Sequence, residues 1–101
     1  MHLIQILLPT ADNAGQPFPR SLFTALRREL TARFGGVTVY ARGPAEGFWD
    51  ADDGQSRDDI VIFEVMADAL DELWWRATRE SLERDFRQDE VVIRAQEVRR
   101  L

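Results

Sequence analysis

Hydrophobic residues recur along this chain with two different spacings, and the order of those spacings limits the folds that it can adopt. Residues 2–8 are apolar and typical of a strand, and the Pro, Gly, Asp and Asn residues that follow predict a loop. From Pro19 to Phe34 an apolar residue returns every three or four positions, which predicts an amphipathic helix. Gly35 and Gly36 are expected to end this helix, because glycine takes the left-handed cap conformation at no steric cost.

The same two spacings return in the second half of the chain. Residues 37–42 and 59–66 alternate as the strands of a hairpin with a long tip. Asp68 is expected to cap a second helix, and a last strand covers residues 90–98. The predicted buried stripe of the second helix is Leu70, Leu73, Trp74, Ala77, Ser81 and Phe86.

The order strand, helix, strand, strand, helix, strand is the split βαβ pattern of the ferredoxin-like fold. An antiparallel four-stranded sheet then carries both helices on one face and leaves the other face bare. A chain of 101 residues, 45% of them hydrophobic, has the size of one domain and can bury one core without metal or disulfides. We therefore expect a single α+β domain over residues 1–101.

Side chains in a strand point alternately to the two faces of a sheet, so each predicted strand divides into two sets. One set is apolar at every position, which predicts that it lies under the helices. Its members are Ile4, Ile6, Leu8, Val37, Val39, Ala41, Val61, Phe63, Val65, Val91, Ile93 and Ala95.

The opposite set mixes aliphatic residues and a tyrosine with charged and amide side chains. Its members are Leu3, Gln5, Leu7, Thr38, Tyr40, Arg42, Ile60, Ile62, Glu64, Met66, Val92, Arg94 and Gln96. A contiguous apolar patch on a protein surface generally marks a site of interaction. Because a twofold pair of identical chains is the commonest assembly, we expect a homodimer through this face.

Two ferredoxin-like sheets packed face to face make a dimeric α+β barrel, and the whole chain resembles that superfamily in its element order. The superfamily includes small cofactor-independent monooxygenases and muconolactone isomerases. The stretch FGGVTVYARGPAEGFW also resembles a group of small bacterial proteins. The resemblance implies the fold and the dimer, and it transfers no catalytic residue.

Composition excludes several kinds of chemistry. The absence of cysteine excludes thiol catalysis, cysteine-bound zinc and disulfides, and it suits a reducing compartment, with the cytoplasm as the default. All thirteen basic residues are arginine, which excludes a lysine Schiff base and pyridoxal phosphate attached to lysine. His2 is the only histidine and cannot alone form a zinc site or a histidine-based triad. We expect no cofactor.

Charge and hydropathy limit the partners. The net charge of −5 repels a polyanion unless arginines cluster on one face, so we expect no nucleic-acid partner. The apolar runs fall far short of the roughly 20 residues of a membrane helix, and we expect a soluble protein. The acidic segment with Asp50, Asp52, Asp53, Asp58 and Asp59 lacks the alternate spacing of a calcium loop, so we expect a solvated loop and no metal.

Glu64 and Tyr40 are the first candidates for a site. Glu64 belongs to the bare face of a strand expected to be central, where desolvation is able to raise the pKa of its carboxyl into the range of a general base. Tyr40 lies a diagonal away on the neighbouring strand and is able to donate a hydrogen bond to an oxyanion. The alternative is a structural ion pair of Glu64 with Arg42 or Arg94, within one chain or across the dimer.

Five further residues lie on the bare face or at its end. Arg42, Arg94 and Gln96 suit a forked contact with a carboxylate, and interface salt bridges are the alternative. The hairpin tip and the loop after the first strand are expected at one end of the sheet. There Phe48 and Trp49 either form a lid over a ligand or close the core or an interface.

Three functions remain open from the sequence. The first is a small homodimeric protein with a binding or accessory role through the bare face. The second is a cofactor-independent monooxygenase or isomerase that acts on a small aromatic or carboxylated compound. The third is an adaptor whose bare face binds a different protein.

Overall fold

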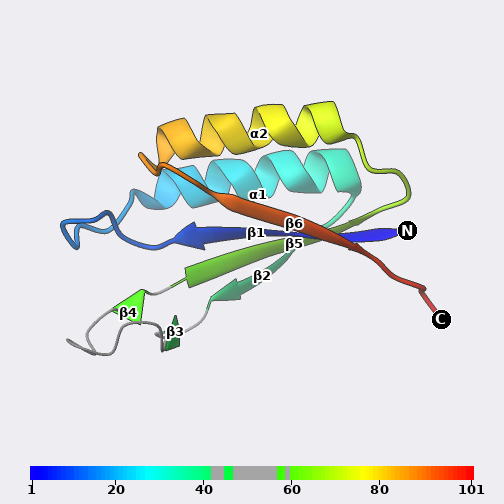
Figure 1. Ribbon diagram of the computed structural model, residues 1–101, viewed down its shortest axis with the longest axis horizontal. Coiled ribbons are helices and arrows are strands. Elements are labelled where there is room, and N and C mark those ends of the chain that lie inside the picture. Colours follow the sequence, from blue (N-terminus) through cyan, green and yellow to red (C-terminus); the bar gives the residue numbers. More distant parts are fainter. Residues whose placement is uncertain (42–44, 47–56, 59) are drawn as a thin grey trace.

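Four antiparallel strands form one open sheet in the order β2-β5-β1-β6 (Figure 1). The computed structural model describes residues 1–41, 45–46, 57–58 and 60–101. The strands are β1 (His2–Pro9), β2 (Thr38–Ala41), β5 (Ile60–Ala67) and β6 (Val92–Glu97). Two further short strands, β3 (Ala45–Glu46) and β4 (Arg57–Asp58), lie between β2 and β5 in the chain and form a separate two-stranded sheet.

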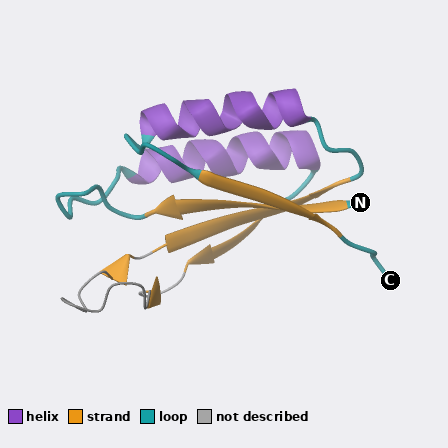
Figure 2. Ribbon diagram, viewed as in Figure 1, coloured by secondary structure: helices purple, strands orange, loops and turns teal. Residues whose placement is uncertain are grey.

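Two helices, α1 (Arg20–Phe34) and α2 (Glu72–Asp85), lie side by side on one face of the sheet (Figure 2). The element order is the predicted one, and the α+β architecture is compatible with the ferredoxin-like fold. Among the described residues, neither helix has the length and apolar character required to cross a membrane.

The strand register confirms the division of the sheet into two faces. Residues directly opposite in an antiparallel pair share a face, and Ile6 of β1 lies opposite both Phe63 and Ile93. The buried members of the predicted helix-side set are Ile4, Ile6, Leu8, Phe63, Val65 and Val91. Val39, in the edge strand β2, belongs to the same face but is 41% exposed. The core therefore lies under the helices and thins out toward the β2 edge.

Helix α1 begins and ends close to the predicted positions. Leu26 and Leu30 are buried, and their neighbours on the same stripe pack against the core. Gly35 adopts a φ of 82° and its N–H donates to the carbonyl oxygen of Thr31 over 2.9 Å. This left-handed cap is the role that the sequence predicts for Gly35.

Helix α2 differs from the prediction in both its start and its buried stripe. The cap is Asp71, whose carboxylate accepts from the N–H of Trp74 over 3.1 Å, and not Asp68. The helix buries Trp75 and Leu82, whereas Leu73, a member of the predicted stripe, is 75% exposed. Two other predicted members, Phe86 and Trp74, are respectively buried and packed against the core. Two candidate stripes overlap in this segment, and the buried one contains Trp75.

Aromatic packing ties the end of α1 to the start of α2. The ring of Phe34 stacks on that of Trp75 at 5.4 Å and meets that of Trp74 edge-on at 5.5 Å. The guanidinium of Arg33 lies 4.2 Å from the centre of the Trp74 ring and 3.3 Å from the Asp71 carboxylate. Asp71 thus caps α2 and binds α1 at the same time.

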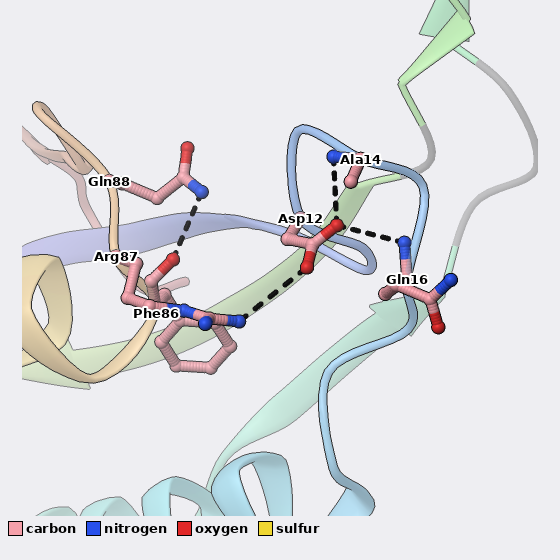
Figure 3. A network of polar contacts seen from close by, with 6 residues as sticks. All are labelled: Asp12, Ala14, Gln16, Phe86, Arg87 and Gln88. Carbon is pink, nitrogen blue, oxygen red and sulfur yellow. Dashed lines mark hydrogen bonds and ion pairs between the residues drawn. The ribbon is translucent and has the colours of Figure 1, made fainter.

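The loop after β1 is held by one aspartate (Figure 3). The Asp12 carboxylate accepts from the N–H groups of Ala14 and Gln16 at 2.9 and 2.8 Å. Its other oxygen lies 3.5 Å from the guanidinium of Arg87, just after α2. This loop and the start of β5 lie at the same end of the sheet, because Pro9 pairs with Ile60. The hairpin tip, predicted to share this end of the sheet, lies mostly outside the described residues, so that part stays a prediction.

Candidate functional site

A row of four hydrogen-bonded polar side chains crosses the face of the sheet that the helices leave open. The Nε–H of Arg94 on β6 donates to Gln5 Oε1 on β1 over 2.9 Å. Gln5 Nε2 donates in turn to Glu64 Oε1 on β5 over 2.8 Å. The hydroxyl of Tyr40 on β2 donates to Glu64 Oε2 over 3.2 Å. Because the sheet order is β2-β5-β1-β6, the polar row contacts every strand of the main sheet.

Strand register explains why these side chains meet. Glu64 lies directly opposite Gln5 on one side, and Gln5 lies opposite Arg94 on the next. Tyr40 pairs with Ile62 and therefore reaches Glu64 along a diagonal, as predicted. Glu64 occupies the interior strand β5, and both of its oxygens accept a hydrogen bond.

The carboxylate of Glu64 does not pair directly with Arg94. The two ion pairs of the described residues are Arg33 with Asp71 and Arg87 with Asp12. Gln5 stands between the cation and the anion and satisfies both, with its carbonyl oxygen toward Arg94 and its amino group toward Glu64. Gln5 therefore holds the positive charge of Arg94 on β6 and the negative charge of Glu64 on β5 one strand apart.

The ionisation of Tyr40 is affected by its neighbour Glu64. The negative charge of Glu64 raises the pKa of the Tyr40 phenol above the usual 10.0, and the hydrogen bond to the carboxylate and some desolvation act in the same direction. The residue is 44% exposed, so solvent reaches the phenol in this state. At neutral pH Tyr40 is a neutral hydrogen-bond donor committed to Glu64.

Apolar side chains border the polar row along the strands. Met66 and Val92 are 51% and 45% exposed. Leu3 lies opposite Met66 and Gln96 on one side of the row, and Leu7 lies opposite Ile62 and Val92 on the other. This surface thus has a polar row in its centre and apolar side chains on both sides of the row. We call it the open face, and it consists of the predicted bare-face residues that the structure describes.

A hollow of about 330 Å³ opens between β1 and β6 beside the polar row. Its lining residues are Leu3, Gln5, Arg94, Ala95 and Gln96. The structure therefore brings Arg94 and Gln96, both predicted as ligand-binding residues, to one depression. Sequence reasoning left Gln5 out of the candidate site, and its signal was its position as the polar residue of β1 on the face that carries Glu64.

Two predicted site residues fall outside the description. Arg42 and Trp49, with Phe48 beside Trp49, lie in the segments that the structure leaves undescribed, so the lid and the contact of Arg42 with Glu64 stay predictions. Within residues 1–41 and 60–101, no three histidine, aspartate or glutamate side chains gather in a way that would hold a metal ion.

Comparison with known proteins gives no relative. No protein-family model, no curated protein and no solved structure matches this chain. The open face and its polar row are therefore the basis for any functional proposal.

Proposed function

We propose that this chain acts as a homodimer whose two copies pair through their open faces, as in a dimeric α+β barrel of ferredoxin-like subunits, and that it has a binding role at that interface. The observation that carries the proposal is the exposure of Tyr40, Met66 and Val92, each between 44% and 51%, on the same face of the sheet, on both sides of the polar row. Apolar groups gathered in this way gain free energy when a partner removes them from water.

Charge distribution favours a second copy as the partner. The polar row has its guanidinium at the β6 edge and its carboxylate on β5, beyond the middle of the sheet. A twofold axis that runs parallel to the strands over the middle of the sheet sets β6 of one copy above the β2 and β5 half of the other. Each Arg94 then faces β2, one strand away from Glu64 on β5. The opposite charges of the two copies therefore attract without Glu64 taking up the terminal nitrogens of Arg94, and the symmetry repeats this arrangement.

The size of the face predicts the strength of the pairing. Neighbouring strands lie about 4.8 Å apart, and each residue of a strand adds about 3.3 Å to its length. One face of a four-stranded sheet of this length therefore has an area of roughly 400 Å². Two such faces bury on the order of 800 Å², less than the roughly 1,200–2,000 Å² of stable complexes and in the range of weak, transient ones. We therefore expect a reversible dimer whose population rises with protein concentration.

Light scattering on matched aspartate variants tests the dimer. Ile62→Asp places an unpaired charge in the interface, which costs several kcal/mol, and is expected to weaken dimerisation by at least about a hundredfold. Leu73→Asp makes the same change at a 75% exposed position on α2 and is expected to leave the mass unchanged. Val92→Asp repeats the test on the edge strand β6 should Ile62→Asp reduce folding. A mass that is unchanged in a folded Ile62→Asp or Val92→Asp variant contradicts the proposal.

The hydrogen bond between Tyr40 and Glu64 favours a second candidate, a cofactor-independent monooxygenase or isomerase. A carboxylate base and a phenol donor on one covered surface are the groups needed to take a proton from carbon and stabilise the oxyanion. A substrate has to displace Tyr40 from Glu64, since that hydroxyl already donates to the carboxylate. Exchange of substrate carbon-bound hydrogen with deuterated solvent, lost in Glu64→Gln, tests this candidate, and exchange that persists in the variant rejects it.

A further inference from the structure

Arg94 carries a positive charge that no carboxylate of the described residues neutralises. Its only described side-chain hydrogen bond runs from Nε to the neutral amide of Gln5. Neither described ion pair includes Arg94. A guanidinium has five N–H donors, so the two terminal amino groups keep four donors that these contacts do not use.

Gln5 fixes which side of the guanidinium is left for a ligand. Arginine binds carboxylates through two parallel N–H donors. Since Nε is held by Gln5 at 2.9 Å, the pair of terminal nitrogens forms the remaining fork. The orientation is further restrained because Gln5 also donates to Glu64 at 2.8 Å and cannot turn freely.

The hollow beside Arg94 has apolar and polar walls that suit one class of ligand. Leu3 provides an apolar wall, and Gln96, which lies opposite Leu3, adds an amide. Its volume of about 330 Å³ lies at the lower end of the range for ligand pockets, which starts near 300 Å³. A small molecule with one carboxylate and a compact apolar body matches the charge, the fork and the walls together.

We propose that the open face binds a small monocarboxylic acid, with its carboxylate in the fork of Arg94 and its apolar body against Leu3. This inference rests on the proposed function, because a guanidinium exposed to bulk water gains little from an anion. The second sheet removes water from the hollow and strengthens the contact. Gln5 acts as a positioning residue that holds the fork in place.

Titration of the labelled protein with benzoate tests the site by nuclear magnetic resonance. Benzoate is expected to shift the backbone amides of Leu3 and Gln96 and the Nε–H of Arg94 in a saturable way, whereas the neutral benzamide leaves them in place. Arg94→Gln removes a charged hydrogen-bond donor and is expected to weaken benzoate binding by at least about tenfold. Arg94→Lys keeps the charge without the fork and is expected to bind with intermediate affinity.

A matched control uses Arg27→Gln, which removes the same charge from an exposed position of α1, on the other side of the sheet. Benzoate binding is expected to survive in this variant. Equal shifts with benzamide, equal loss in Arg27→Gln, or the absence of saturable shifts in the wild type overturns the carboxylate site.

Light scattering on the same samples separates the two proposals. A wild-type dimer that does not bind benzoate rejects the carboxylate site and leaves the dimer standing. If Arg94→Gln also dissociates this dimer, the carboxylate that Arg94 binds is Glu64 of the second copy. That result explains the absence of benzoate binding and overturns the carboxylate site. A wild type that stays monomeric at every concentration rejects the proposed function itself.

Discussion

The hydroxyl of Tyr40 donates to the carboxylate of Glu64 over 3.2 Å, across the neighbouring strands β2 and β5. Tyr40 is the only tyrosine of the chain. The contact therefore gives the candidate site a spectroscopic reporter of its own, because the absorbance of a phenolate can come from no other residue.

We predict that Tyr40 titrates with a pKa above 10.0, since the charge of Glu64 disfavours a second negative charge beside it. Glu64→Gln removes this charge and is expected to bring the pKa back toward 10.0. Absorbance titration in the near ultraviolet measures both values, with circular dichroism at each pH to show that the chain stays folded. Equal pKa values in the two proteins would contradict the contact.

The same shift predicts how the contact contributes to stability. A phenol whose pKa is higher in the folded than in the unfolded chain stabilises the fold while it is protonated. The contribution is fully present below the unfolded value of about 10.0 and is lost as the pH rises through the raised pKa. Urea unfolding at neutral and alkaline pH should show this loss in the wild type and a smaller loss in Glu64→Gln.

The bridge formed by Gln5 predicts an energetic coupling with Glu64. In a double-mutant cycle with Gln5→Ala and Glu64→Ala, the hydrogen bond of 2.8 Å should give a coupling of about 0.5–1.5 kcal/mol in the free energy of unfolding. A second cycle with Gln96→Ala and Glu64→Ala is the control, because Gln96 lies opposite Leu3 and not opposite Glu64. Urea unfolding at one protein concentration measures both, and equal couplings would refute the bridge.

The two aspartates near the start of α2 are predicted to differ in their effect on stability. Asp71→Ala removes the cap on Trp74 and the exposed ion pair with Arg33, and should lower the free energy of unfolding by about 1 kcal/mol, mostly through the cap. Asp68→Ala removes a similar charge three residues earlier and is expected to change stability little. Thermal unfolding distinguishes the two positions, and a larger effect at Asp68 would restore the cap that the sequence pattern favoured.

Arg87 is the one described non-glycine residue with a positive φ, at 49°. The left-handed conformation costs a residue with a Cβ about 1–2 kcal/mol. Arg87→Gly and Arg87→Ala both lose the pair with Asp12, whose arginine side is 72% exposed. Relief of the left-handed strain should therefore favour the glycine variant over the alanine variant by about 1 kcal/mol. The larger conformational entropy of glycine in the unfolded chain offsets part of this gain. An alanine variant that is more stable than the glycine variant by about 0.4–1 kcal/mol would show that the backbone at this position is unstrained.

The two faces of the sheet were predictable because strand periodicity is fixed by geometry. Three polar members of the predicted bare face, Gln5, Glu64 and Arg94, come from three different strands, and the observed register places all three on the open face. The hydrogen bonds among them were not predictable. They depend on which residues lie opposite one another, and a single sequence does not give the register between strands that are far apart in the chain.

Helix α2 shows where periodicity alone fails. Leu73 and Trp75 belong to different apolar stripes, and each stripe is compatible with an amphipathic helix. Packing of Phe34 against the Trp75 ring selects the second stripe. That contact joins two helices that lie far apart in the chain. The buried stripe of α2 therefore depends on tertiary packing, and Leu73 stays exposed.

The central claim is that a second copy of the chain covers the open face, and contacts between copies measure it most directly. In a mixture of isotope-labelled and unlabelled chains, filtered nuclear Overhauser spectra should show contacts from the methyl groups of Leu7, Ile62 and Val92 to the other copy. Those of Leu26 and Leu30, the buried residues of α1 in the core, should contact only their own chain. Spectra without contacts between copies for Leu7, Ile62 and Val92, at concentrations well above the dissociation constant expected for a weak dimer, would contradict the account.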